Sequence, residues 1–256
     1  MSGDFSRSAA LVPRLEVVDA TGSTNADLRR NADDADAWPH LSVLLTRHQT
    51  AGRGRLDRRW VAPAGSALAV SVLLRDLPAE PAARGWIPLA AGAAMTEAVA
   101  AQLPDAAVVL KWPNDVLVDG RKICGILAEA TPTAVIVGAG VNTAMTATQL
   151  PVPTATSFAV QGTVVDEDEL LRSYVSALDG HLRALAAADD ATASGLHAAV
   201  TARCATVGQA VRVSLPGGSL LEGVAVGIDD EGRLLVAAEG TVHAVSAGDV
   251  VHVRPA

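Results

Sequence analysis

The chain contains 256 residues, half of them hydrophobic, and its 28 acidic and 20 basic residues give it a net charge of −8. This length suits one large domain, or one domain with a small companion, and the apolar content is sufficient for a sizeable core. The acidic balance argues against general nucleic-acid binding, so we expect no specific DNA binding.

The first half of the chain alternates between strand and helix patterns. It predicts strands over 15–20, 41–49 and 66–75 and helices over 21–30 and 84–103. Ser23, Thr24 and Asn25 are good N-caps, which favours a helix start there. The last of these helices contains Pro88, Thr96 and Glu97, which indicates a buried helix and no membrane span.

The second half predicts successive strands over 108–142, with turns at "PND", "DGR" and "TPT", and then helices over 166–188 and about 190–203. From residue 207 onward, short strands separated by glycine-rich turns are typical of a small β-barrel. We therefore expect an α+β fold, with a mixed sheet and helices over residues 1–204 and a small SH3-like β-barrel over 205–256.

The segment "GRGRLDRR", residues 52–59, concentrates four arginines and two glycines in an acidic chain. Such a segment can be a solvated surface loop, an arm that contacts DNA, or a clamp for a local anion. DNA binding needs a broader basic face than this chain offers, which favours the anion clamp. Trp60, at the end of the segment, suits either base stacking or core packing.

Only two of the 20 basic residues are lysines, Lys111 and Lys122, and both lie in "KWPNDVLVDGRKICGIL". A compact ammonium is not equivalent to a guanidinium, so a lysine kept in this background suits a defined anion site. We expect Lys122, beside an apolar strand, to be partly desolvated, although a surface lysine is the alternative. Gly125 would let a ligand approach the backbone. The "GAG" at 138–140 is a weak nucleotide motif, and we expect a tight turn there.

Cysteine and histidine usage predicts a reduced, cytoplasmic protein. Cys124 and Cys204 lie far apart, and the six histidines are scattered, so we expect neither a disulfide nor a resident metal site. The N-terminus lacks the apolar core of a signal peptide, and we expect no association with membranes.

Four motifs taken together resemble biotin protein ligases. "GSTN", "HQTAGRGR…W", "KWPNDV…KICGIL" and "GAGVN" follow one another in the order and spacing of that family, from about residue 15 to 142. The resemblance implies an enzyme that activates biotin with MgATP to biotinoyl-5′-AMP and then transfers biotin to one lysine of a biotin carboxyl carrier domain. It implies biotin, ATP and Mg²⁺ as ligands.

The resemblance also assigns residues. It implies a biotin site made of Ser23, Thr24, Asn25, Gln49, Gly52, Arg53, Gly54, Arg55, Lys122 and Gly125. It implies a nucleotide site made of Arg55, Arg58, Trp60, Lys111, Asn114 and Asn142. Lys122, Arg55 and Asp115 are the implied catalytic residues, with Lys122 between the biotin carboxylate and the α-phosphate and Asp115 near the acceptor lysine.

Two residues depart from the family pattern. Asp57 stands where the loop usually has glycine, and Cys124 occupies a small-residue position, where we expect it to pack. About 20 residues precede "GSTN", which we expect to be too few for the helix-turn-helix domain of the repressor type. A lipoate–protein ligase and a non-catalytic biotin sensor or DNA-binding regulator are the alternative functions.

Overall fold

The computed structural model describes residues 4–55, 58–215, 218–246 and 248–252. A seven-stranded sheet forms the centre, in the order β1-β2-β3-β7-β6-β5-β4. Its strands are β1 (Leu15–Val17), β2 (Ser42–Thr46), β3 (Ala67–Leu74), β4 (Val108–Lys111), β5 (Asp115–Val118), β6 (Arg121–Ala130) and β7 (Val135–Asn142). β1 and β2 are parallel, and the other neighbours are antiparallel.

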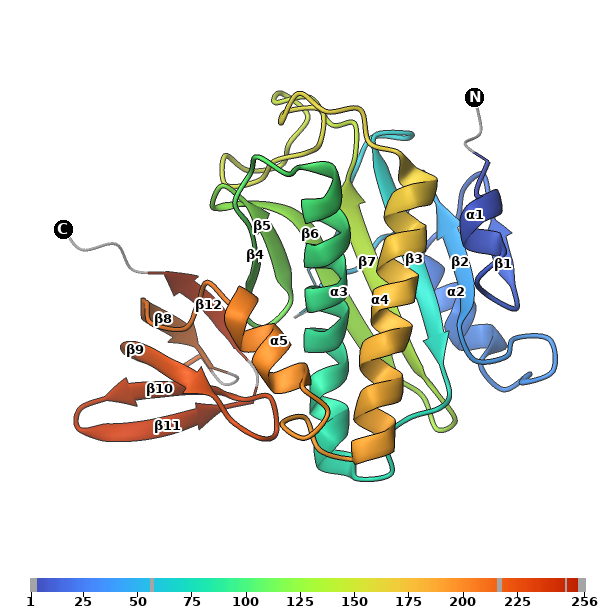
Figure 1. Ribbon diagram of the computed structural model, residues 1–256. Helices are drawn as coiled ribbons and strands as arrows, with labels where there is room; N and C mark the ends of the chain where they lie inside the picture. The colour runs from blue at the N-terminus through green and yellow to red at the C-terminus, as the bar shows by residue number, and fades with distance from the viewer. Residues whose placement is uncertain (1–3, 56–57, 216–217, 247, 253–256) are drawn as a thin grey trace.

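Helices cover both faces of this sheet. α3 (Ile87–Gln102) and α4 (Glu167–Ala188) lie side by side over one face (Figure 1). α2 (Thr24–Asn31) covers the other face, where Leu28, Leu44 and Ile136 belong to a second, smaller core. β2 and β3 are buried along their whole length because both of their faces are covered. The face of the seven-stranded sheet opposite α3 and α4 is therefore covered only in part, by α2.

Several elements begin or end elsewhere than the sequence predicts. The predicted helix 84–103 is a 3₁₀ helix, η1 (Pro81–Trp86), followed by α3, whose second residue is Pro88. The predicted helix 190–203 begins only at α5 (Leu196–Arg203), because Gly195 has a φ of 79° and sets its start. A one-turn helix, α1 (Ser6–Ala9), was not predicted; Asp168 of α4 holds it, accepting hydrogen bonds from Ser8 N at 2.9 Å and Ser8 Oγ at 2.6 Å.

The C-terminal part is one antiparallel sheet of five strands, in the order β11-β10-β9-β8-β12. Its strands are β8 (Ala210–Ser214), β9 (Leu220–Ile228), β10 (Leu234–Ala238), β11 (Thr241–Val245) and β12 (Asp249–His252). The α+β class with a small C-terminal β unit is thus confirmed. The proposed boundary at residue 204 stays a prediction, since one apolar core runs through both parts.

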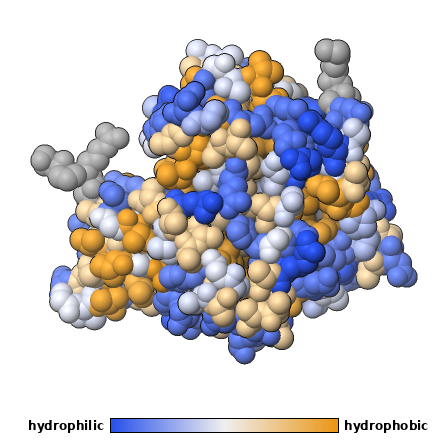
Figure 2. All heavy atoms as spheres, in the orientation of Figure 1, coloured by the Kyte–Doolittle hydropathy of each residue, from blue (hydrophilic) through white to orange (hydrophobic). Residues whose placement is uncertain are grey.

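The C-terminal sheet is fixed to the main body by two tryptophans. Trp86 Nε1 donates to Asp230 O at 2.7 Å, and Trp112 Nε1 donates to Gly232 O at 3.0 Å. Its outer side is apolar in places: Figure 2 shows hydrophobic residues over this sheet, and Leu220, Val224, Val226 and Val242 are exposed. No helix among the described residues is both long and apolar enough to cross a membrane.

Candidate active site

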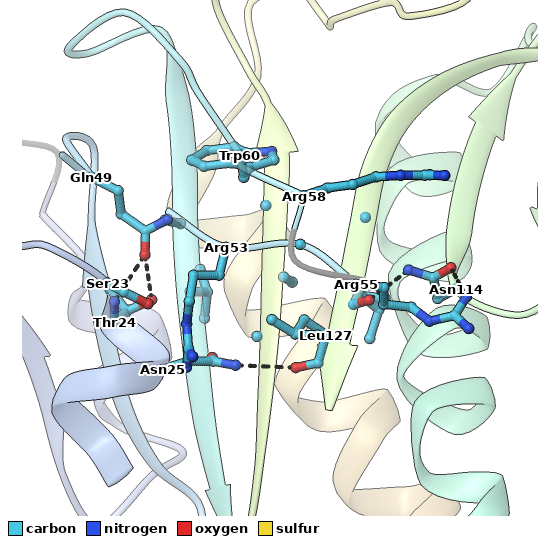
Figure 3. A pocket seen from close by; sticks show the side chains of 18 of the residues that line it. Ser23, Thr24, Asn25, Gln49, Arg53, Arg55, Arg58, Trp60, Asn114 and Leu127 are labelled. Atoms are coloured by element: carbon cyan, nitrogen blue, oxygen red, sulfur yellow. Dashed lines mark hydrogen bonds between the residues drawn. The ribbon is translucent and has the colours of Figure 1, made fainter. Parts of the chain in front are cut away.

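A cleft opens on the sheet face that α2 partly covers, between the start of α2, the middle of β6 and β7, and residues 51–60, here called the arginine loop (Figure 3). It is lined by Ser23, Thr24, Asn25, Gln49, Arg53, Gly54, Arg55, Arg58, Arg59, Trp60, Ala69, Val70, Asn114, Asp115, Lys122, Gly125, Ile126, Leu127, Gly138, Ala139 and Gly140. Of the 16 predicted site residues, 13 are therefore brought to one place. Their roles stay predictions.

One end of the cleft is uncharged and largely buried. We call its lining residues Ser23, Thr24, Asn25 and Gln49, together with the fully buried Ser71 that contacts two of them, the buried end. Ser23 caps α2 by accepting a hydrogen bond from Ala26 N. Gln49 Oε1 accepts from Thr24 N at 2.8 Å and from Thr24 Oγ1 at 3.1 Å. Ser71 Oγ lies 2.6 Å from Asn25 Oδ1 and 2.7 Å from Thr24 Oγ1. These contacts fix the polar groups before any ligand arrives.

Glycines in β7 let two side chains lie flat against the sheet. A Cβ on Gly138 would collide with Asn25 Oδ1, and one on Gly140 would lie 2.7 Å from Trp60 Cε2. The prediction of a tight turn at 138–140 is wrong: both glycines lie inside β7. Their role is to make room for Asn25 and Trp60.

The other end of the cleft carries the charges; we call Asn114, Asp115, Lys122, Arg55 and Arg58 the charged end. Lys122 Nζ lies 2.6 Å from Asp115 Oδ1. The Lys122 side chain is 43 % exposed, so the expected desolvation is limited and a carboxylate balances its charge. A Cβ on Gly125 would lie 3.0 Å from Lys122 Nζ, so the glycine makes room for the ammonium itself.

An irregularity in β6 determines where Lys122 points. The pairing of β5 with β6 shifts between Val116 and Leu117, which leaves Ile123 as an extra residue. Ile123 and Cys124 are consequently both buried, although side chains normally alternate along a strand. Burial raises the pKa of the Cys124 thiol to about 12, which agrees with a packing role. The bulge thus aims Lys122 into the cleft.

The arginine loop turns back on itself beside the cleft. Gly54 N donates to Arg58 O at 2.7 Å, and Trp60 N donates to Gly52 O at 3.0 Å. Arg55 Nη1 donates to Asn114 Oδ1 at 3.1 Å, and Arg55 Nη2 donates to Gly248 O of the C-terminal part at 3.3 Å. Asn114 in turn donates to Ile126 O at 2.7 Å. Arg55 thus connects the arginine loop to the C-terminal part directly and to β6 through Asn114. Asp57 lies outside the described residues.

Three predicted residues are not among those that line the cleft. Gly52 lies behind it, where a Cβ would meet Trp60 O at 2.5 Å. Asn142 is buried and donates to Thr156 O at 2.9 Å, so it holds the segment after β7. Lys111, at the end of β4, lies near His252 of β12, and burial together with the Lys111 charge lowers the pKa of that histidine.

Sequence reasoning missed Ser71 and Glu129. Ser71 is fully buried in an otherwise apolar strand, and a single hydroxyl in such a run is a signal that it has a buried partner. Glu129 accepts hydrogen bonds from Asn25 Nδ2 at 2.8 Å and Arg53 Nη2 at 2.8 Å. Nothing around Glu129 in the sequence distinguishes it from a solvated charge at a strand end.

The cleft offers one carboxylate, Asp115, among its lining residues. Among the described residues, no group of three or more histidine, cysteine, aspartate or glutamate side chains could hold a metal ion. Mg²⁺ commonly keeps several waters and binds through substrate phosphates with one or two carboxylates. The single carboxylate fits a Mg²⁺ ion that arrives with a nucleotide.

Two family profiles match the chain. Residues 17–142 match the biotin/lipoate A/B protein ligase family, and residues 206–253 match the biotin protein ligase C-terminal domain. The chain is 42 % identical over 245 residues to a biotin–[acetyl-CoA-carboxylase] ligase of Mycobacterium tuberculosis, covering 94 % of this chain and 90 % of that protein.

Two further likenesses agree with these. A biotin–[acetyl-CoA-carboxylase] ligase of Paracoccus denitrificans is 34 % identical over 243 residues, covering 90 % of this chain and 97 % of that protein. A biotin protein ligase from Aquifex aeolicus, solved in complex with biotin and ATP, superposes with a TM-score of 0.77 at 23 % identity, covering 95 % of this chain and all of that one. At this identity the structure shows the fold alone.

Proposed function

The chain belongs to the biotin protein ligase family, and on this premise we propose that it activates biotin with ATP and transfers it to one lysine of a biotin carboxyl carrier domain. The observation that carries the proposal is the two-ended cleft. An uncharged, hydrogen-bonding end and a cationic end are joined by a floor of glycines on β6 and β7. Biotin has the matching form, with a neutral ring system at one end and a carboxylate at the other.

In the first step, a carboxylate oxygen of biotin attacks the α-phosphorus of ATP. A carboxyl–phosphate bond forms, the bond between the α- and β-phosphates breaks, and pyrophosphate leaves. Two anions must approach each other, so fixed positive charge stabilises the transition state. Lys122 on β6 lines the cleft beside Gly125, and Arg55 and Arg58 of the arginine loop line the same cleft.

Lys122 would exchange partners in this step. In the structure its ammonium pairs with Asp115, and a substrate carboxylate and phosphate would compete for the same ammonium. Asp115, released from the pair, then lies at the cleft with a free carboxylate. In the second step the amine of the acceptor lysine attacks the carbonyl carbon, AMP leaves, and Asp115, the one carboxylate among the lining residues, would take the proton.

Mg²⁺ supplies charge neutralisation of the ATP phosphates when it is bound. Asn114 and Asp115 are the oxygen-bearing side chains at the charged end that could reach it. We also infer that the acceptor belongs to acetyl-CoA carboxylase, as in the names of the two bacterial relatives. Cytoplasmic action fits the two buried free cysteines. No specific DNA binding is expected.

A lipoate–protein ligase is the second candidate, because the matching family profile covers both ligases. The buried end argues for biotin. Its polar groups, Ser23 Oγ, Thr24 Oγ1 and the Gln49 amide, suit a cyclic urea, which both donates and accepts hydrogen bonds. A dithiolane ring offers no comparable partners, and polar groups left unpaired in a buried site disfavour such a ligand strongly.

Incubating the purified protein with labelled biotin, MgATP and a carrier domain tests the proposal. We expect one biotinoyl group on the carrier, and none on a carrier whose acceptor lysine is replaced by arginine. A parallel reaction contains lipoate and a lipoyl domain in place of biotin and the carrier domain. Modification of the lipoyl domain in preference to the biotin carrier would assign the protein to the second candidate, and modification of neither would contradict both.

A further inference from the structure

The carboxylate of Glu129 contacts residues on two sides of the buried end, the side of α2 and the side of the arginine loop. Glu129 lies on β6. Because side chains alternate along a strand, it lies on the same side as Gly125 and Leu127, both of which line the cleft. Its side chain is only 14 % exposed. Three side chains donate to it: Asn25 from α2, Arg53 from the arginine loop, and Arg29 from the last turn of α2. None of these four residues is adjacent in sequence to another.

On the side of the arginine loop, both carboxylate oxygens of Glu129 accept hydrogen bonds from Arg53. Arg53 Nη2 lies 2.8 Å from Oε1 and 3.0 Å from Oε2. Arg53 also pairs with Arg59 through the backbone, so it belongs to the hairpin formed by the arginine loop. Figure 3 shows the Arg53 side chain running down the cleft toward Asn25. The carboxylate therefore fixes the start of the loop against β6.

On the side of α2, Glu129 accepts a hydrogen bond from the buried side-chain amide of Asn25. Asn25 is 4 % exposed. Its Oδ1 contacts Ser71 Oγ, and its Nδ2 donates to Leu127 O at 3.2 Å and to Glu129 Oε2 at 2.8 Å. Both amide hydrogens are thus occupied. Asn25 acts as a fixed wall of the buried end, and Glu129 is one of the groups that fix it.

We propose that Glu129 is a positioning residue for biotin: it holds Arg53 and Asn25 at the cleft so that the buried end exists before biotin binds. The inference rests on the proposed function. Without the carboxylate, Arg29 and Arg53 face each other with no counter-charge between them, and Asn25 loses a partner it cannot replace from water. Biotin would then have to reorder the site as it binds, which weakens affinity. The charged end, on the other side of the loop, keeps its contacts.

The experiment is direct biotin binding by calorimetry with the full chain, together with biotin-dependent adenylation kinetics. For Glu129→Gln, which keeps the size of the side chain and removes its charge, we expect biotin to bind about tenfold more weakly. The kcat at saturating biotin should change by less than about twofold, since Lys122 and Arg55 are untouched. Amide exchange at Gly54 and Trp60, which bond within the hairpin, should quicken in the ligand-free variant.

A double-mutant cycle and a matched control separate positioning from general damage. In an Arg53→Gln background, Glu129→Gln should weaken biotin binding by less than it does in the wild-type background, because the contact with Arg53 is already broken and only the contact with Asn25 remains to be lost. Arg29→Gln removes the other arginine, which lines no part of the cleft, and should leave biotin affinity within about twofold of wild type. Glu129→Asp, one methylene shorter, should recover part of the lost affinity.

The outcomes are distinguishable. Wild-type protein that binds no biotin contradicts the proposed function. Wild-type binding with an unchanged biotin Kd for Glu129→Gln overturns the inference, as does a weakening that is equal in the Arg53→Gln background. If Glu129→Gln does not fold, the contrast between Arg53→Gln and Arg29→Gln decides: equal biotin affinities of these two variants also overturn it.

Discussion

The two ends of the cleft are built differently. At the buried end, Thr24, Asn25, Gln49 and Ser71 are held by one another and by β6, and three of them, Thr24, Asn25 and Ser71, are almost fully enclosed. At the charged end, which is partly open to solvent, Lys122 pairs with Asp115, and Arg55 donates to Asn114 Oδ1 and Gly248 O. A preformed hydrogen-bonding site selects a ligand, whereas charges with exchangeable partners can follow a reacting phosphate. We infer that the buried end recognises the ligand and that the charged end carries out the chemistry.

Lys122→Ala should give the largest effect and the sharpest separation of the ends. We expect adenylation to fall by about 10²–10³-fold, the scale for removing one group that stabilises transition-state charge. Biotin should still bind, because the buried end is intact. Pyrophosphate exchange and biotin calorimetry on the same preparation measure both quantities. Lys122→Arg should not fully rescue, since a planar guanidinium cannot take the place of the ammonium over Gly125. Near-wild-type exchange by the arginine variant would remove Lys122 from its assigned role.

Arg55→Ala should affect the intermediate more than its formation. A lost charge-assisted hydrogen bond costs about 1.5–3 kcal/mol, so biotinoyl-5′-AMP should be held roughly ten- to a hundredfold less tightly. Released adenylate would biotinylate lysines of bystander proteins, which streptavidin blotting detects. Arg212→Ala, on the exposed face of β8, is the control and should label only the carrier. Equal bystander labelling by the two variants would mean that Arg55 does not retain the intermediate.

Ser71→Ala tests whether the buried end is truly a fixed network. The change leaves Asn25 Oδ1 without a partner in an almost fully enclosed place, whereas Thr24 Oγ1 keeps its bond to Gln49, so we expect a loss of about 1–3 kcal/mol in the free energy of unfolding. Biotin affinity should fall by about tenfold or less. Ser176→Ala, exposed on α4, serves as the control in denaturant unfolding. If both variants unfold alike, the network contributes nothing and the contrast between the two ends disappears.

Lys111→Ala should give the smallest effect. Lys111 and Lys122 look equivalent in the sequence, but Lys111 lies near His252 and is not among the residues that line the cleft. We expect the KM for ATP to change by less than about twofold. A rise of tenfold or more would restore Lys111 to the nucleotide site that the family resemblance implies.

The sequence predicts the strands, the two long helices and the place of most site residues, because periodicity and the four motifs are local signals. It does not predict Glu129, whose importance comes from Asn25 and Arg53, each more than 75 positions away. It also misplaces Gly138 and Gly140, since glycine in a strand and glycine in a turn look alike until the side chain above is known. The bulge at Ile123, which aims Lys122 into the cleft, has no sequence signature either.

The most direct test of this account is biotin-dependent exchange of labelled pyrophosphate into ATP by the wild-type protein. The assay needs no carrier domain, and it reports the reaction that joins the two ends of the cleft. We predict rapid exchange with biotin, none without it, and exchange slower by at least about a hundredfold when lipoate replaces biotin. No exchange with biotin under conditions where biotin and ATP both bind, or equal exchange with lipoate, would contradict the account.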